Sequence, residues 1–182
     1  MIIAETLYGK FINMRSVEES DAEFILQLRL DSYNSQYINK TENDLDKQIE
    51  WIKSQRSRNN DYYFLYTDKE NTKAGVISVY NIDNKKAESG RFISFGNSVQ
   101  NIEAVLMHYN FAYYELGIDL VHFTVSKNNK KVANMWKRLG IPMVGEKKVN
   151  GIDSHYFELT KDIYESTVKP NIMKVFSNMK DQ

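Results

Sequence analysis

A strand–helix–strand unit in the second half of the chain constrains the fold most. Residues 87–95 (AESGRFISF) and 121–125 (VHFTV) are typical of short strands, and the segment between them has helical periodicity. The apolar positions of this segment, expected to be helical over about 101–116, are Ile102, Val105, Leu106, Tyr109, Ala112, Tyr113 and Leu116. Gly117 suits the C-terminal end of the helix. A crossover of this kind predicts that the two strands run parallel with a right-handed connection.

The remaining elements surround this unit and give the order β α α β β β α β α β β. Further strands are expected at 11–17, 61–67 and 74–82, at the residues that precede the Gly9-Lys10 turn, and as a hairpin around Asn150-Gly151. Further helices are expected from Ser20 or Asp21, from Thr41 with Asp44 in a capping box, and over 129–139. This order predicts an α/β domain.

Composition excludes several classes of protein. Lys plus Arg and Asp plus Glu both number 24 in 182 residues, so the chain lacks the basic excess of a general nucleic-acid binder. It has no cysteine, and its three histidines do not have the spacing of metal ligands, so we expect no metal site. Charged residues in the first ten positions argue against a signal peptide, and no apolar run reaches the length of a membrane span. We therefore expect a cytoplasmic protein with no membrane or nucleic-acid partner.

Residues 110–141 (NFAYYELGIDLVHFTVSKNNKKVANMWKRLGI) resemble the GNAT acetyltransferases, and within them the RimJ/RimL-like members. The matching residues are Phe111, Ala112, Glu115, Leu116, Gly117, Val121, Val125, Asn129, Leu139 and Gly140. The resemblance implies a mixed central sheet with a splayed parallel strand pair flanked by helices. It also implies transfer of an acetyl group from acetyl-CoA, as co-substrate, to an amine.

A narrower similarity concerns the acceptor. GRFISFGNS, followed later by NKKV, resembles acetyltransferases that act on nucleotide-linked amino sugars in surface-polysaccharide pathways. The resemblance therefore favours a small amine acceptor, with a protein N-terminus or an aminoglycoside-type amine as alternatives. A different alternative is a catalytically silent module that binds acetyl-CoA. The acceptor pocket is expected from the loops at 31–41 and 145–156.

The resemblance places the acetyl-CoA site at the start of the helix of the β-α-β unit, where free backbone N–H groups and the helix dipole favour a pyrophosphate. The expected residues are Gly96, Asn97, Ser98, Val99, Gln100, Asn101 and Ile102, although the glycines and the arginine of the usual loop are missing. A bulge at Ile93, Ser94 and Phe95 is expected to present backbone N–H groups to the thioester oxygen. Asn129 is expected to bind the pantetheine arm or to cap the next helix.

The catalytic groups are less well defined. The tyrosine that the family uses as general acid corresponds to Trp136, whose indole is expected to donate a hydrogen bond or to pack against the pantetheine sulfur. Tyr156, His155 or a water would then supply the proton. Glu88 is the first candidate for the base, acting through water, and His155 is its rival.

The C-terminal segment is amphipathic. We expect one domain over 1–165 and a tail over 166–182, in which Ile172, Val175, Phe176 and Met179 share a helical face. This face is buried either by the protein's own sheet or by a second subunit, and the family resemblance favours a homodimer.

Overall fold

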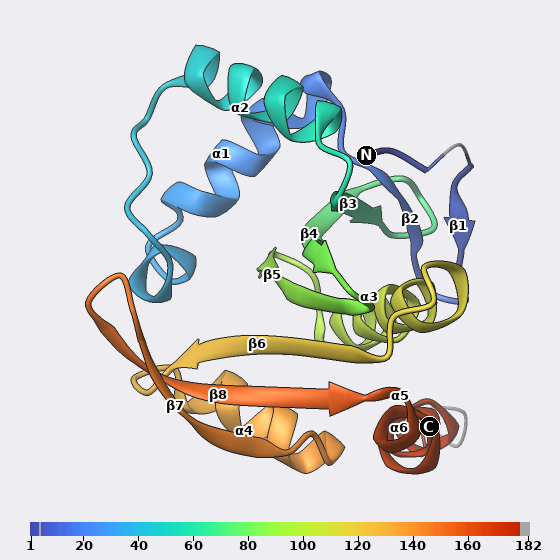
Figure 1. Cartoon of the computed structure of the whole chain (residues 1–182). Coiled ribbons are helices and arrows are strands. Elements are labelled where there is room, and N and C mark those ends of the chain that lie inside the picture. The colour runs from blue at the N-terminus through green and yellow to red at the C-terminus, as the bar shows by residue number, and fades with distance from the viewer. Residues whose placement is uncertain (4, 179–182) are drawn as a thin grey trace.

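Eight strands form a mixed sheet in the order β1-β2-β3-β4-β5-β6-β8-β7 (Figure 1). The computed structural model describes residues 1–3 and 5–178. The pair β5–β6 is parallel and the other neighbouring strands are antiparallel. The strands are β1 (Leu7–Tyr8), β2 (Asn13–Ser16), β3 (Asp61–Thr67), β4 (Lys73–Asp83), β5 (Lys86–Ser94), β6 (Leu120–Ser126), β7 (Met143–Val149) and β8 (Ile152–Thr160).

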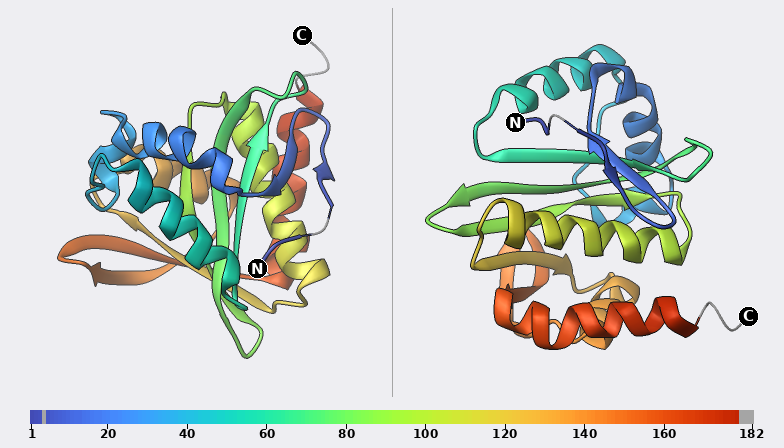
Figure 2. Two further views of the ribbon diagram at one scale, coloured as in Figure 1. Left: turned by 90° about the horizontal axis from the view of Figure 1, so that it is seen from above. Right: turned by 90° about the vertical axis from the view of Figure 1, so that its right-hand side faces the viewer.

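Helices cover both faces of the sheet, with α1 and α2 on one face and α3, α4 and α6 on the other (Figures 1 and 2). Their bounds are α1 (Ala22–Leu30), α2 (Leu45–Ser57), α3 (Ser98–Asn110), α4 (Lys130–Leu139), α5 (Lys161–Ile163) and α6 (Lys169–Asn178). No helix in the described part of the chain combines the length and the apolar character that crossing a bilayer requires.

The predicted β-α-β unit is confirmed. Strand β5, helix α3 and strand β6 follow one another, and β5 and β6 run parallel. Helix α3 begins at Ser98, a little before the predicted start, and continues as a π-helical turn over Phe111–Glu115. Gly117 follows with a φ of +65°, a left-handed conformation that glycine adopts without steric cost.

The starts of two helices differ from the prediction. Helix α2 is capped by Asp44, whose side chain accepts from the backbone N–H of Lys47, while the Thr41 hydroxyl accepts from Arg29 Nε at 2.8 Å. Neither Ser20 nor Asp21 caps α1 with its side chain, because the Asp21 carboxylate is bonded to the Arg15 guanidinium at 2.7 and 2.9 Å. In both cases a contact with a residue outside the local sequence redirects the side chain.

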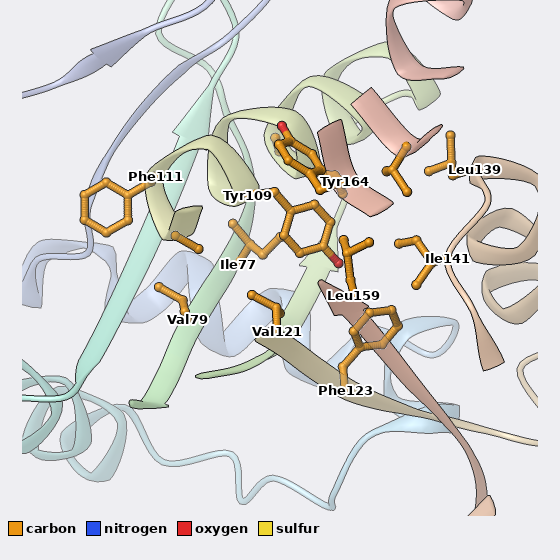
Figure 3. Close-up of a cluster of buried hydrophobic side chains, with 14 of the residues drawn as sticks. Ile77, Val79, Tyr109, Phe111, Val121, Phe123, Leu139, Ile141, Leu159 and Tyr164 are labelled. Carbon is orange, nitrogen blue, oxygen red and sulfur yellow. The ribbon is translucent and has the colours of Figure 1, made fainter. Parts of the chain in front are cut away.

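The larger core cluster lies between the sheet and the helices α3, α4 and α6 (Figure 3). The rings of Tyr109, Tyr113 and Tyr164 lie within 5.0–6.2 Å of one another by their centroids. Of the tail's apolar face, Ile172 and Phe176 are buried in this cluster. The described part of the tail therefore packs on the chain's own core, whereas Met179 lies outside the described residues.

Glu103 joins the N-terminal turn to α3. The residue is 4% exposed, and its carboxylate accepts from the backbone N–H groups of Lys10, Phe11 and Ile12 at 2.6–2.8 Å. The lack of a side chain at Gly9 lets the turn approach α3 this closely, because a Cβ there would lie 2.8–2.9 Å from atoms of Met107 and Glu103. Helix α3 is thus fixed to the β1–β2 turn by a buried, fully bonded carboxylate.

The parallel pair separates soon after it begins. Strand β5 pairs with β6 only from Lys86 to Glu88, opposite Leu120 to His122. Beyond Glu88, β5 continues beside β4 alone up to Ser94. Beyond Glu88, the facing edges of β5 and β6 therefore carry backbone groups that are not paired with each other.

Candidate active site

A cleft of about 1140 Å³ lies where β5 and β6 diverge. It is lined by β5 from Glu88 to Ser94, by the start of α3, by β6 from Phe123 to Ser126, by one face of α4 and by the loop between α1 and α2. Helices α3 and α4 cover one face of the sheet and the α1–α2 loop belongs to the other, so elements from both faces border the cleft.

The predicted coenzyme loop borders this cleft. Of its expected residues, Ile93, Ser94, Gly96, Asn97, Ser98, Asn101 and Ile102 line the cleft, whereas Phe95, Val99 and Gln100 do not.

The start of α3 is a closed capping box. Asn97 Oδ1 accepts from the backbone N–H groups of Val99 and Gln100, both at 3.0 Å, and Gln100 Oε1 accepts from the backbone N–H of Asn97 at 2.8 Å. The N–H of Gly96 is also bonded, to the carbonyl of Ala74 and to Ser94 Oγ. Within the described chain, the Ser98 N–H is the amide of this turn for which the structure shows no protein acceptor.

The predicted bulge exists, but not at the predicted place. The register between β4 and β5 shifts between the pairs Val76–Ile93 and Ser78–Gly90, so Arg91 and Phe92 together oppose Ile77. Arg91 has a φ of +52°, the strained residue of the bulge. The interruption therefore precedes Ile93, Ser94 and Phe95, and the N–H groups of Phe95 and Gly96 are bonded to the carbonyl of Ala74.

Helix α4 forms a basic wall. Lys131 and Arg138 line the cleft from one face of the helix, two turns apart. Asn129 lines it as well and also caps α4, its side chain accepting from the backbone N–H of Val132 at 3.3 Å. Lys127, by contrast, is paired with Glu146 at 2.5 Å. Two of the cations that line the cleft are thus on this helix, and the third, Arg91, is on β5 and is paired with Asp61.

Trp136 is a packing residue. It is 5% exposed, and its ring centroid lies 5.2 Å from Phe123, 6.4 Å from Phe92 and 6.5 Å from Tyr109. The indole forms part of the cleft wall. The indole is therefore packed among aromatic side chains of the protein, and its contact with the pantetheine stays a prediction.

Glu88 stands at the point where the strands diverge. Its Oε1 accepts from the Tyr80 hydroxyl at 2.7 Å and its Oε2 from Asn81 Nδ2 at 2.9 Å, and Glu88 and Tyr80 line the cleft. Glu88 is paired with His122 across β5 and β6, and His122 with Glu158 across β6 and β8. These side chains share the sheet face that α1 and α2 cover.

The two other catalytic candidates lie on opposite faces of β8. Tyr156 is on the face of Glu88 and donates to Glu158 at 3.0 Å. Burial, followed by this bond to Glu158, raises the pKa of Tyr156 to about 12, so the phenol stays protonated at neutral pH. His155 is on the face of α4, with Nδ1 3.9 Å from Glu146 Oε1, and it does not border the cleft. Tyr156 is therefore on Glu88's face of the sheet, but, like His155, it does not border the cleft.

Several lining residues were not singled out from the sequence. Tyr80 and Arg91 lie on segments that the sequence predicts as strands, with no sign of a role in a site. Arg138 follows Lys131 at a spacing that places both on one face of a helix, so the sequence does contain a signal for it. Tyr33, Asn34, Tyr37 and Ile38 belong to the predicted acceptor loop 31–41 and do line the cleft. From the second predicted loop, 145–156, Asn150 reaches Asn39 of the first at 3.4 Å.

Solved structures of acetyltransferases have the same fold as this chain. The chain resembles the structure of apo FdhC, described as a nucleotide-linked sugar GNAT, at 26% identity with a TM-score of 0.76, covering 90% of this chain and 94% of that one. It shares its fold with a mutant of the spermidine N-acetyltransferase SpeG from Vibrio cholerae (16% identity, TM-score 0.74, coverage 87% and 98%). It also shares it with the ribosomal-protein-S5-alanine acetyltransferase from Vibrio fischeri (17% identity, TM-score 0.70, coverage 87% and 97%).

No curated protein sequence matches the chain significantly. The profile of the family "Acetyltransferase (GNAT) domain", however, matches residues 12–141, which is more than half of the chain. The splayed parallel pair, the helix that starts beside it and the cleft between them are the parts that an acetyltransferase of this kind requires. The chain belongs to the GNAT acetyltransferase family.

Proposed function

We propose that this protein transfers an acetyl group from acetyl-CoA to the amine of a small anionic acceptor, with a nucleotide-linked amino sugar as the first candidate. The observation that carries the proposal is the cleft that passes between β5 and β6, with a helix start and a basic wall on one side and a held carboxylate on the other. GNAT domains use acetyl-CoA, and the residues of this cleft fit that co-substrate.

The acetyl-CoA side is formed by α3, α4 and the free side of β5. The Ser98 N–H and the dipole of α3 suit a pyrophosphate, and Lys131 and Arg138 supply positive charge beside it. Backbone groups of β5 beyond Glu88, including Ile93 and Ser94, have no partner on β6, so they suit the amides of a pantetheine arm added as a further strand. Asn129 lies on the same path.

The acceptor side contains the proton acceptor. An ammonium group must lose a proton before its nitrogen attacks the thioester carbonyl, and Glu88 takes that proton through a water. The C–S bond then breaks, and the departing thiolate takes up a proton. Trp136 is a packing residue, and the two side chains expected from the sequence, Tyr156 and His155, do not border the cleft, which favours water as the proton donor.

Charge indicates the class of acceptor. Besides Glu88, the charged residues of the cleft are Arg91, which is paired with Asp61, and the cations Lys131 and Arg138. Because Lys131 and Arg138 lie on the acetyl-CoA side, Glu88 is the carboxylate left for the acceptor. A single carboxylate is poorly suited to a polyamine, which would need several. The similarity to a nucleotide-linked sugar GNAT favours the nucleotide-linked amino sugar.

Two measurements test the proposal. Thermal shift with acetyl-CoA and with CoA separates a binder from a protein without this site, since a ligand of the native state raises its stability. Release of free thiol is then followed with a nucleotide-linked amino sugar, an aminoglycoside, spermidine and a peptide with a free N-terminus. We expect turnover with the first of these. Binding without turnover on any amine would favour the silent module, and turnover on the peptide or the aminoglycoside would favour those alternatives.

The base is tested by the pH dependence of kcat/KM. Glu88→Gln should lower kcat/KM at every pH, whereas His155→Ala should leave the profile nearly unchanged because His155 does not border the cleft. An ascending limb near pH 6–7 that vanishes in His155→Ala would reverse the assignment. If neither substitution changes kcat/KM by more than about threefold, the substrate's own deprotonation carries the reaction.

A further inference from the structure

Tyr80 and Glu88 face each other across β4 and β5. They are direct partners in the antiparallel register, and both line the cleft. The Tyr80 hydroxyl donates to Glu88 Oε1 at 2.7 Å, and Asn81 Nδ2 donates to Oε2 at 2.9 Å. With a donor on each oxygen, the carboxylate is held in one orientation at the point where the two strands diverge.

The Tyr80 ring is held in turn. The Arg91 guanidinium lies 4.1 Å from the ring centroid, and it is bonded to both carboxylate oxygens of Asp61 at 2.7 and 3.0 Å. Asp61 is 3% exposed, so this ion pair is anchored in the interior. The bulge in β5 brings Arg91 to this place, since its left-handed backbone directs the side chain onto Tyr80.

Gly90 provides the room for the hydroxyl. A Cβ at Gly90 would lie 2.8 Å from the Tyr80 hydroxyl oxygen and 3.2 Å from Cε1. Gly90 does not have a positive φ, so its backbone accepts alanine and the obstacle is the tyrosine alone. The absence of a side chain at residue 90 is thus explained by the path of the Tyr80 hydroxyl to Glu88.

We propose that Tyr80 is a positioning residue for acetyl transfer, which holds Glu88 in the orientation that accepts the proton of the amine, and that Gly90 and Arg91 keep Tyr80 in place. The proposal rests on the proposed function, in which Glu88 is the base. Without the Tyr80 hydroxyl, Asn81 is the one remaining donor to the carboxylate in the described chain, and Glu88 can turn away from the amine.

The first test compares Tyr80→Phe with Tyr113→Phe. Tyr113 is a matched control because it is buried and its hydroxyl donates to the Leu159 carbonyl at 2.6 Å, away from the cleft. In Tyr80→Phe we expect kcat near pH 7 to fall about five- to tenfold, with the KM for acetyl-CoA within about twofold of the parent. Tyr113→Phe should lower the melting temperature and leave kcat and KM within about twofold of the parent. A kcat of Tyr80→Phe within about twofold of the parent, or an equal loss of kcat in both variants, overturns the proposal.

The second test uses Gly90→Ala, which keeps the hydroxyl and obstructs its path. Gly90→Ala should lower kcat about as much as Tyr80→Phe does, and adding it to Tyr80→Phe should change little further, because the obstructed atom has gone. Independent, multiplying effects of the two substitutions would contradict the shared mechanism.

Failure of the proposed function is recognised separately. A Glu88→Gln enzyme with parental kcat/KM overturns the assignment of the base and with it the positioning role, while acetyl transfer itself stands. An inactive Glu88→Gln beside an unaffected Tyr80→Phe overturns the positioning role alone. If the parent transfers acetyl to none of the amines tested, the proposed function fails. The melting temperatures of Tyr80→Phe, Glu88→Gln and the double variant then decide the contact: less-than-additive losses support it, and additive losses overturn it.

Discussion

Asn97 and Gln100, at the start of α3, each accept a hydrogen bond from the other's backbone N–H through a side-chain oxygen. Asn97 Oδ1 accepts from the N–H of Gln100 at 3.0 Å, and Gln100 Oε1 accepts from the N–H of Asn97 at 2.8 Å. A glycine-rich loop would leave these amides free for a phosphate, whereas this pair occupies them with side chains. The donors that remain for an anion at this helix start are therefore the Ser98 N–H and the helix dipole.

Ser98→Pro should weaken acetyl-CoA binding without unfolding the chain. Ser98 is the first residue of α3, where proline is well tolerated, and Asn97 already has the extended backbone that precedes a proline. The substitution removes the N–H assigned to the pyrophosphate, and we expect a loss of roughly tenfold in affinity by titration calorimetry. Ser98→Ala, which keeps the N–H, is the control. Equal affinity in both variants would remove the pyrophosphate from this turn.

Trp136→Phe should retain appreciable turnover. The indole is packed among Phe92, Phe123 and Tyr109, so the smaller ring costs packing, on the order of 1–2 kcal/mol in the free energy of unfolding, rather than a proton donor. Steady-state kinetics with acetyl-CoA in excess measure the effect. Should turnover collapse while coenzyme affinity and folding hold, the indole N–H has a direct role in the chemistry.

His108 should make the folded state sensitive to acid. It is fully buried, and Nε2 donates to the Ser78 carbonyl at 3.0 Å, while Nδ1 has no partner in the described chain. Burial lowers the pKa of His108 from 6.5 to about 4, an effect that the bond to Ser78 only partly offsets. Between these two pH values the unfolded chain binds a proton that the folded chain does not, so stability falls as the pH falls.

The expected loss between about pH 6.5 and pH 4 is on the order of 3 kcal/mol. Urea denaturation at several pH values measures it, and His108→Gln, which retains a donor for Ser78, provides the reference without the titrating group. A parent and a variant with parallel pH dependence would show that His108 titrates normally.

The tail contributes to stability through one face of α6. Phe176 is 7% exposed and lies 5.6 Å from Phe11 by ring centroids, whereas Met173 on the same helix is 48% exposed. Phe176→Ala should cost about 3–5 kcal/mol in the free energy of unfolding, and Met173→Ala less than about 0.5 kcal/mol. Light scattering on both variants tests assembly at the same time. A change of mass in Phe176→Ala with unchanged stability would make this face a subunit contact instead.

The sequence predicted the fold well because the pattern of apolar residues is local. Strand 61–67, the unit from β5 to β6 and the hairpin at Asn150-Gly151 are all set by periodicity or by turn residues within a few positions. The structure agrees with these predictions, including the parallel pair. The features that were not predicted depend on contacts between residues far apart in the sequence.

The bulge shows why. Its position was inferred by counting residues from a resemblance, but it lies at Arg91 and Phe92, where Arg91 is bonded to Asp61, thirty residues away. Thr41 was expected to cap α2, and its hydroxyl instead accepts from Arg29. Glu88 could be chosen by its place on a strand, whereas the donors that hold it, Tyr80 and Asn81, are visible only once β4 and β5 are paired.

The bond of Glu103 to the N-terminal turn couples that turn to ligand binding. Glu103 lies in the second turn of α3, whose first residue, Ser98, is proposed to bind the pyrophosphate. Its carboxylate accepts hydrogen bonds from the backbone N–H groups of Lys10, Phe11 and Ile12. Any ligand that steadies the start of α3 also steadies these bonds, which are remote in sequence and away from the cleft. Acetyl-CoA should therefore slow hydrogen exchange at the β1–β2 turn, where it makes no contact.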